Sequence, residues 1–316
     1  MRFHQPLSVA CSLALLAASA QAGTVVLKRA WIDAYKNRAT IDAKVNVDEV
    51  KPQPNPVSKG SADGDLHMAS RSDDVGLPFV SEIVNAAEEA DAVKVAKNAK
   101  SGAPIAISGA WRLWFEHPAK NPQIQGQPVA VAEDTNPLHV FEIHPISSIG
   151  GTDVKNAFHP ITGKARGNSP PAEYEAYDAA TAFGHYEGMQ ITVQPSATAV
   201  TLTAPMVGYN YAQFYVKLGQ RLAVQDGTLV LAQIQDAEGN SVAASPVRLA
   251  FVKGTPAETL LQQAKAGATL HLLGIPRVNL ERIANLVGKM AVGQRVTVKL
   301  PYEMIVVGVY DDSKEQ

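Results

Sequence analysis

Cysteine is nearly missing from this sequence of 316 residues, which holds a single one, Cys11. That residue lies in an N-terminal segment that has the form of a secretory signal peptide, with a basic start, a short apolar run and a small-x-small ending at Ala22. Cleavage after Ala22 leaves a mature chain without cysteine. We therefore expect a periplasmic or secreted protein that forms no disulfide and depends on apolar burial for its stability.

Long apolar runs, a strong charge of one sign and the familiar catalytic motifs are missing as well. The apolar run at residues 7–18 is too short for a transmembrane helix, and no other segment is a candidate. The formal net charge of −2 argues against a nucleic-acid binder, because such proteins usually carry a basic excess or stripe. There is no GxSxG serine motif, no phosphate-binding loop and no HExxH zinc motif.

The sequence does contain a succession of strand patterns interrupted by one helix. Residues 38–50 alternate with period two, Ile41 and Val45 lying on the apolar face, as in a half-buried strand. Further strands are expected at residues 65–70, 78–84, 104–117 and 139–149. An alanine-rich helix that ends at Gly102 separates the third expected strand from the fourth. Five strands with a helix in that place are the order of an OB-type barrel.

The second half of the chain resembles the first and indicates an internal duplication. Residues 99–113 align with residues 264–278, and "FEI" at 141–143 aligns with "YEM" at 302–304. The fold class expected is therefore mainly β with short helices, in the form of two tandem OB-like barrels after the signal peptide.

The predicted domains follow from this duplication. The first barrel occupies residues 23–162 and the second, more diverged barrel occupies residues 181–316. Residues 163–180 are rich in Gly, Ser and Pro and are expected to link them. The second part also carries an extra hairpin near residues 189–205, which joins either a barrel or a partner.

Three residues of the first copy recur in the second. Gly109, Arg112 and Glu142 align with Gly274, Arg277 and Glu303. A glycine inside a strand typically marks a bulge or a bend, which a small barrel needs for closure. The arginine and the glutamate of each copy are expected to form an ion pair across the barrel. Because both copies have these residues, we interpret them as architectural.

Five polar residues occur in the first copy only. Asp65, His67, Glu82, His139 and His144 align with Thr228, Val230, Ala250, Leu300 and Ile305. Two interpretations stay open: the five residues form one functional feature of the first barrel, or they mark a face that is exposed in the first copy and covered in the second.

The residue types in this set suit a metal site. Asp65 and His67 share a strand face, as do Glu142 and His144, because residues two apart on a strand point to the same side. Imidazole and carboxylate groups on neighbouring strands are ligands for zinc or another divalent cation. However, the spacing matches no established zinc motif, and His139 has the opposite parity from His144.

A structural interpretation competes with the metal site. Proline follows His117, His144 and His159, and such pairs are typical of strand ends, where a histidine commonly bonds a nearby carbonyl or carboxylate. Trp114 offers another alternative. If it is exposed it could stack on a sugar or a base, and otherwise it packs beneath a loop.

Three separated elements resemble a group of exported bacterial proteins with an OB-like domain. They are Asp63-Gly64-Asp65-Leu66-His67, Glu82-Ile83 and Glu142-Ile143-His144-Pro145. The resemblance covers roughly residues 30–150 and implies a fold, with no established activity.

The "DGD" element also resembles the thermonuclease-like branch of the OB fold. That resemblance implies that Asp65 and Glu82 bind the metal of a phosphodiesterase, with Arg71 or Arg112 on the phosphate.

From these observations we expect an exported binding or interaction module more than an enzyme. Its ligand face would lie on strands two and three of the first barrel, where OB barrels commonly bind and where Asp65, His67 and Glu82 belong. A metal-dependent hydrolase that uses the same residues is the alternative. The sequence names neither the ligand nor a protein partner.

Overall fold

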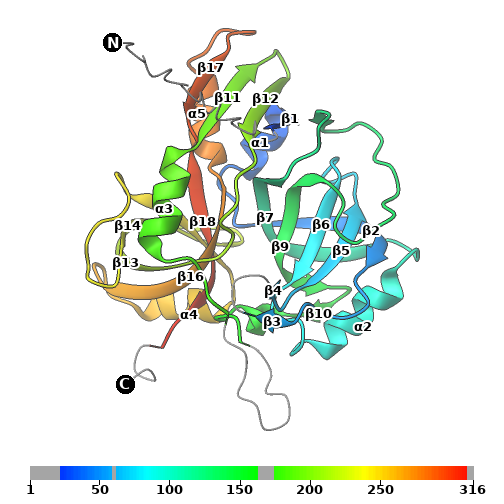
Figure 1. The fold of residues 1–316 in the computed structure, drawn as a ribbon, viewed down its shortest axis with the longest axis horizontal. Coiled ribbons are helices and arrows are strands. Elements are labelled where there is room, and N and C mark those ends of the chain that lie inside the picture. Colours follow the sequence, from blue (N-terminus) through cyan, green and yellow to red (C-terminus); the bar gives the residue numbers. More distant parts are fainter. Residues whose placement is uncertain (1–21, 59–61, 163–173, 312–316) are drawn as a thin grey trace, which may run out of the picture.

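The computed structural model of the chain describes residues 22–58, 62–162 and 174–311 (Figure 1). Its secondary structure is 46% strand and 17% helix, and the strands build two closed five-stranded barrels with short helices, so the predicted fold class is confirmed. Most of the predicted signal peptide and the greater part of the predicted linker lie outside the described residues. In the part of the chain that is described, no helix is long and apolar enough to cross a membrane.

The first barrel contains every strand predicted for residues 38–149. Its strands are β2 (Thr40–Val50), β5 (Leu66–Arg71), β6 (Phe79–Ile83), β7 (Ile105–His117) and β9 (His139–Ile149). They pair in the order β2-β5-β6-β9-β7 and close through β7 and β2, with β6 and β9 parallel and the other pairs antiparallel. The helix α2 (Ala90–Ala99) follows β6 in the chain. This connectivity is that of an OB barrel.

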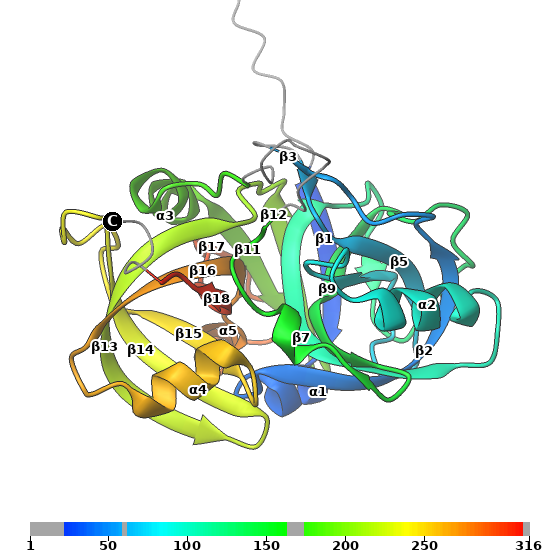
Figure 2. The same cartoon turned by 90° about the horizontal axis from the view of Figure 1, so that it is seen from below.

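The second barrel repeats the same connectivity. Its strands are β13 (Ala212–Val224), β14 (Gly227–Gln235), β15 (Val247–Val252), β16 (Thr269–Val278) and β18 (Tyr302–Val309). They form a closed barrel in the order β13-β14-β15-β18-β16, with β15 and β18 parallel, and α4 (Pro256–Gln263) follows β15. The two barrels lie side by side, with β7 in contact with β16 (Figure 2).

A third sheet draws strands from both predicted domains. Its order is β17 (Val296–Lys299), β11 (Gln190–Pro195), β12 (Ala199–Pro205), β1 (Ala22–Lys28) and β8 (Gln123–Ile124). The hairpin predicted near residues 189–205 is β11 and β12, and it joins this sheet.

The remaining elements are α1 (Arg29–Tyr35), α3 (Ala179–Gly188), α5 (Leu280–Val287), the 3-10 turn η1 (Lys155–Ala157), and the short strands β3 (Val57–Ser58), β4 (Ala62–Asp63) and β10 (Thr152–Asp153).

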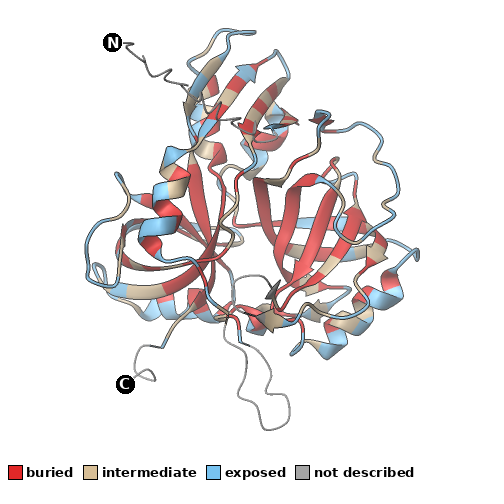
Figure 3. Cartoon of the chain, in the orientation of Figure 1, coloured by how far each residue is buried: buried red, intermediate tan, exposed pale blue. Residues whose placement is uncertain are grey.

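Side chains on β9 alternate between the barrel interior and its outer face. Phe141 points inward and packs edge-on against Phe79 and Trp31, with ring centroids 6.2 and 5.6 Å away. Glu142 and His144 therefore point outward, since they alternate with the inward-facing residues. Even so, both are buried, and β9 is buried along most of its length (Figure 3). The outer face of this strand is covered.

Reciprocal arginine contacts hold the two barrels face to face. Arg112 Nε donates to the carbonyl of Pro276 at 3.0 Å, and Arg277 Nη1 donates to the carbonyl of Trp111 at 3.0 Å. Arg112 and Arg277 are counterparts in the repeat, as are Trp111 and Pro276. Each bond is thus the image of the other when the copies are exchanged, as in the self-complementary interface of a two-fold dimer.

Each of these arginines also pairs with the glutamate opposite it on the neighbouring strand. Arg112 Nη1 lies 2.5 Å from Glu142 Oε2, and Arg277 Nε lies 2.6 Å from Glu303 Oε1. Both pairs lie on outer faces of the barrels, so the prediction of an ion pair across the barrel is wrong. The residues are shared by both copies because they build the contact between the barrels.

Both strand glycines mark irregularities, as the sequence predicts. The β7–β9 ladder shifts at Gly109, and the β16–β18 ladder shifts at Gly274. A Cβ atom on Gly109 would lie 2.6 Å from the carbonyl oxygen of Pro145, and one on Gly274 would lie 2.9 Å from that of Ile305. Backbone approaches this close leave no room for a side chain.

Gly109→Ala is expected to lower the free energy of unfolding by about 1–3 kcal/mol, because the new methyl group forces β7 away from β9. Gly184→Ala is the matched control. Gly184 lies in α3 and a Cβ there would have no atom within 4 Å, so alanine should stabilise by about 0.5–1 kcal/mol. Urea denaturation of both variants measures the difference. Equal effects of the two substitutions would contradict this reading of Gly109.

Candidate functional site

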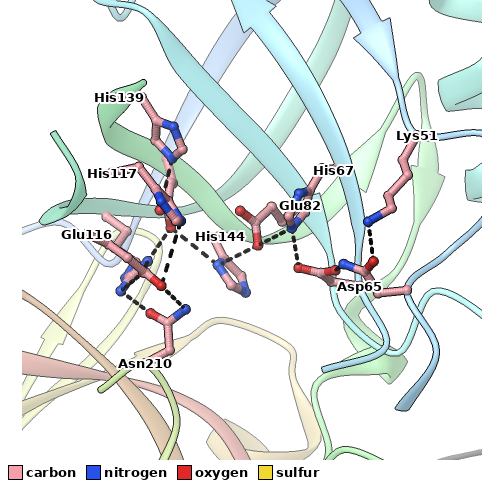
Figure 4. Close-up of polar contacts among 12 residues, drawn as sticks. Lys51, Asp65, His67, Glu82, Glu116, His117, His139, His144 and Asn210 are labelled. Carbon is pink, nitrogen blue, oxygen red and sulfur yellow. Dashed lines mark hydrogen bonds and ion pairs between the residues drawn. The ribbon is translucent and has the colours of Figure 1, made fainter. Parts of the chain in front are cut away.

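All five polar residues that are specific to the first copy come together on the outer face of β5, β6 and β9. In the ladder, His67 of β5 pairs with Glu82 of β6, and β6 runs parallel to β9. Asp65 immediately precedes β5, and His139 and His144 lie on β9. The result is a continuous line of polar contacts (Figure 4).

The end of this line nearest to solvent is centred on His67. Its Nε2 lies 2.8 Å from Asp65 Oδ2 and 3.9 Å from Glu82 Oε2. Asp65 Oδ1 accepts a hydrogen bond from the Asn55 amide at 2.5 Å, and Lys51 donates to the Asn55 oxygen. The side chain of His67 is 16% exposed, against 8% for Glu82 and 1% for Asp65. Solvent therefore reaches this cluster at His67.

The middle of the line is His144, which joins two carboxylates. Its Nδ1 lies 2.9 Å from Glu82 Oε2 and 3.3 Å from Glu142 Oε2, while its Nε2 lies 2.8 Å from the Tyr211 hydroxyl. The His144 side chain is only 1% exposed. Both ring nitrogens are thus engaged, and the ring orientation is fixed by three partners.

The far end is fully buried and contains a permanent cation, Arg112. This guanidinium contacts Glu142, Glu116 and Asn210. His139 also reaches Glu142, with Nε2 at 3.1 Å from Oε1. His139 and His144 therefore share one carboxylate, so opposite parity does not separate them. The β7–β9 ladder is irregular on both sides of Glu142, and strict alternation fails there.

The electrostatics of the solvent-facing end reflect crowded carboxylates. Burial disfavours the charged form of His67, but Glu82 and the bond to Asp65 outweigh burial and raise its pKa to about 10. Burial raises the pKa of Glu82, whereas His144 and His67 lower it, and the net pKa lies below its ordinary value. Burial and the charge of Asp65 together raise the pKa of Asp63 to about 7. At this end three carboxyl groups, Asp63, Asp65 and Glu82, surround one protonated imidazole.

At the buried end the charges are balanced. Burial raises the pKa of Glu142, but Arg112 and the bonds from His139 and His144 hold it well below its ordinary value. Burial lowers the pKa of His144, but Glu82 and Glu142 raise it well above its ordinary value. For His139, the bond to Glu142 likewise overcomes burial and raises the pKa. The histidines here act as cations that compensate buried carboxylates.

The second barrel shows what the fold needs without this cluster. Glu82 pairs with His67, and its counterpart Ala250 pairs with Leu229. The counterpart of His67 is thus Leu229, not Val230, and by the same register Asp65 corresponds to Gly227, not Thr228.

The burial of His144 decides whether this residue marks a functional feature or only a face that is exposed in the first copy and covered in the second. His144 is 1% exposed and its counterpart Ile305 is 0% exposed, so a difference in exposure does not explain the change from histidine to isoleucine. The polar cluster is an addition to a barrel that closes without it.

The structure decides several points that the sequence left open and corrects the expected place of His144-Pro145. Trp114 is only 1% exposed and packs edge-on against Tyr186 at 5.6 Å, so it is not a surface platform for stacking. His117 does end its strand, but His144 and Pro145 lie inside β9, where the ladder to β7 is interrupted. Proline is tolerated there because an interrupted ladder requires no donor from it.

The two arginines suggested for a phosphate are both bound to carboxylates of the protein. Arg71 forms three hydrogen bonds with Asp48, at distances of 2.7 to 3.0 Å. Arg112 is fully buried and held by Glu142 and Glu116. Both guanidinium groups are therefore paired with carboxylates other than Asp65 and Glu82.

Sequence reasoning missed some members of the cluster. Asn210 and Tyr211 come from the segment just before β13, and Tyr211 is 67 positions away from His144, its partner. No periodic pattern links positions in different barrels, so these contacts leave no signal in the sequence. Asp63 was visible in the "DGD" element but was not singled out.

Comparison with known proteins gives no further guide to this site. The chain matches no family model, no curated protein and no solved structure. The resemblance to exported OB-like proteins stays a prediction, and the function has to be argued from the cluster itself.

Proposed function

We propose that the chain is an exported binding protein whose ligand site is the outer face of β5 and β6 in the first barrel, and whose ligand is positively charged. One observation carries the proposal: the carboxylates of Asp63, Asp65 and Glu82 gather at the end of the cluster that solvent reaches. A site of this charge favours a cation over an anion.

Among the described residues, the carboxylates of Asp65 and Glu82 bond to one amide and two imidazoles, and to no lysine or arginine side chain. Asp65 and Glu82 bond to the amide of Asn55 and to the imidazoles of His67 and His144. Lys51 donates to Asn55, which in turn donates to Asp65. The protonated imidazoles of His67 and His144 balance two of the three carboxyl groups. A bound cation would balance the third.

The alternative, a metal-dependent phosphodiesterase, shares the carboxylates but has lost its proposed phosphate contacts. Arg71 and Arg112, which that alternative requires on the phosphate, are held by Asp48 and by Glu142. The cluster therefore supports the binding of a cation by Asp65 and Glu82, but it does not support the binding of a phosphate by these arginines.

Calorimetric titration of the mature protein, residues 23–316, tests the proposed function. The probes are Ca²⁺, Zn²⁺, Mn²⁺, spermidine and a lysine-rich peptide. At least one of them should bind, and Asp65→Asn should weaken binding by about 10- to 100-fold because one charged contact is lost. Asp42→Asn removes an exposed carboxylate of the same barrel and should leave the affinity unchanged. Failure of every probe, or equal affinity in both variants, would refute the proposal.

A further inference from the structure

The residue types at the solvent-facing end of the cluster indicate which kind of cation binds there. We infer, on the basis of the proposed function, that the ligand is a divalent transition-metal ion held by Asp65, His67 and Glu82. The ligand atoms of these three residues, one imidazole nitrogen and two carboxylate oxygens, all lie within 4.8 Å of one another. His67 and Glu82 pair on adjacent strands of a closed barrel and Asp65 immediately precedes β5, so the backbone fixes their separation.

A second group, Glu82, Glu142 and His144, meets the same distance limit and shares Glu82 with the first. The two groups differ in what already occupies them. Arg112 lies 2.5 Å from Glu142 Oε2, so a guanidinium neutralises the second group, which is also fully buried. Among the described residues no guanidinium forms an ion pair with the first group, and solvent reaches this group at His67. The metal therefore belongs to the first group.

In this assignment His144 is a positioning residue. Its Nδ1 lies 2.9 Å from Glu82 Oε2, and the Tyr211 hydroxyl holds its other nitrogen. Carboxylates that bind metals are commonly fixed in this way by hydrogen bonds from neighbouring groups. Tyr211 precedes the first strand of the second barrel, so the second barrel supports a site on the first.

The donor set selects among metals. Calcium and magnesium prefer sites made of oxygen atoms only, and soft ions such as Cu⁺ prefer sulfur. One imidazole with two carboxylates suits Zn²⁺ or Mn²⁺. Three protein ligands leave at least one coordination position for water or for a bound molecule.

The duplication supplies an independent argument. At the positions of His67 and Glu82 the second barrel has Leu229 and Ala250, paired in the same way between the same two strands. The barrel thus folds with an apolar pair at this point. Barrel closure therefore does not require an imidazole and two carboxylates at this point, and a bound metal gives these side chains a role.

Titration of EDTA-treated mature protein with ZnCl₂ and with MnCl₂ tests the inference. One ion per chain should bind, and His67→Leu and Glu82→Ala should each weaken binding by about 100-fold or more. Both substitutions introduce the residue of the second barrel, and circular dichroism reports whether the fold is kept. His67→Gln provides a second variant that retains a polar side chain. His117→Ala is the matched control, because it removes a histidine of the same barrel outside the group.

The outcomes separate the inference from the function on which it rests. Stoichiometric metal binding that survives His67→Leu and His67→Gln would overturn the inference. Binding of spermidine or the lysine-rich peptide, lost in Asp65→Asn but with no binding of Zn²⁺ or Mn²⁺, would overturn the metal and retain the proposed function. If none of the cations binds, both are refuted.

Discussion

Glu303→Gln is expected to lower the free energy of unfolding by about 3–5 kcal/mol, the usual cost of breaking a buried ion pair from one side. Glu303 has no exposed surface, and its carboxylate accepts hydrogen bonds from Arg277 and Arg248. A neutral amide leaves the fully buried Arg277 without a carboxylate partner among the described residues, and it leaves Arg248 with Glu281 alone. The large cost follows from the uncompensated charge of Arg277.

Glu49→Gln is the control for this experiment. Glu49 pairs with Lys100, but the two side chains are 27% and 45% exposed, so solvent screens the pair and its loss should cost no more than about 1 kcal/mol. Urea denaturation followed by tryptophan fluorescence measures both variants. Similar midpoints for the two would show that Glu303 does not have the role assigned to it.

Asp226→Asn is expected to destabilise the protein by about 2–3 kcal/mol at pH 7, because charge-assisted hydrogen bonds are lost. Asp226 precedes β14 and binds the segment that begins β2. Its carboxylate accepts from Arg38 Nε at 2.8 Å, from the backbone of Ala39 at 3.1 Å, and from Thr40 N and Oγ1 at 2.8 and 2.9 Å. It is a second connection between the barrels, and an amide can reproduce only part of it.

The effect of Asp226→Asn should also depend on pH. Burial raises the pKa of Asp226, but the bonds from Arg38 and Thr40 outweigh burial and leave this pKa below its ordinary value. A lowered folded pKa means that the stabilisation is complete above the unfolded value of about 4 and is lost as the pH falls through the folded value. The gap between wild type and variant should therefore narrow below about pH 4. A constant gap from pH 7 to pH 2.5 would contradict this account.

The barrels were predictable because their strands have simple periodicity. Residues 38–50 alternate so clearly that β2 begins within two positions of the expected point. The third sheet was not predictable as a unit, because β1 pairs with β12 and β17 pairs with β11 across long distances in the chain. A short strand carries no mark of its partner, and only the closed backbone ladder reveals it.

The sequence was sufficient to predict which residues belong to the candidate site, but not that the second barrel covers part of it. Strand parity placed Asp65 and His67 on one face and brought Glu82 next to them. The repeat identified the residues that the second barrel lacks, although one inserted position displaced the alignment and gave Val230 as the counterpart of His67. Outward-facing polar residues look solvent-exposed in a sequence, so the burial of Glu142 and Arg112 against the other barrel could not be foreseen.

The pairing of β1 with β12 also has a consequence for how the chain is completed. Thr24 bonds to Thr203, 179 positions further along. Each barrel is built from a contiguous segment, whereas β1 pairs with a strand that follows the whole first barrel in the chain. A chain that ends before residue 199 would lack the antiparallel partner of β1, and an unpaired strand edge invites pairing with other chains. The third sheet therefore makes the first strand of the fold depend on residues far beyond the first barrel.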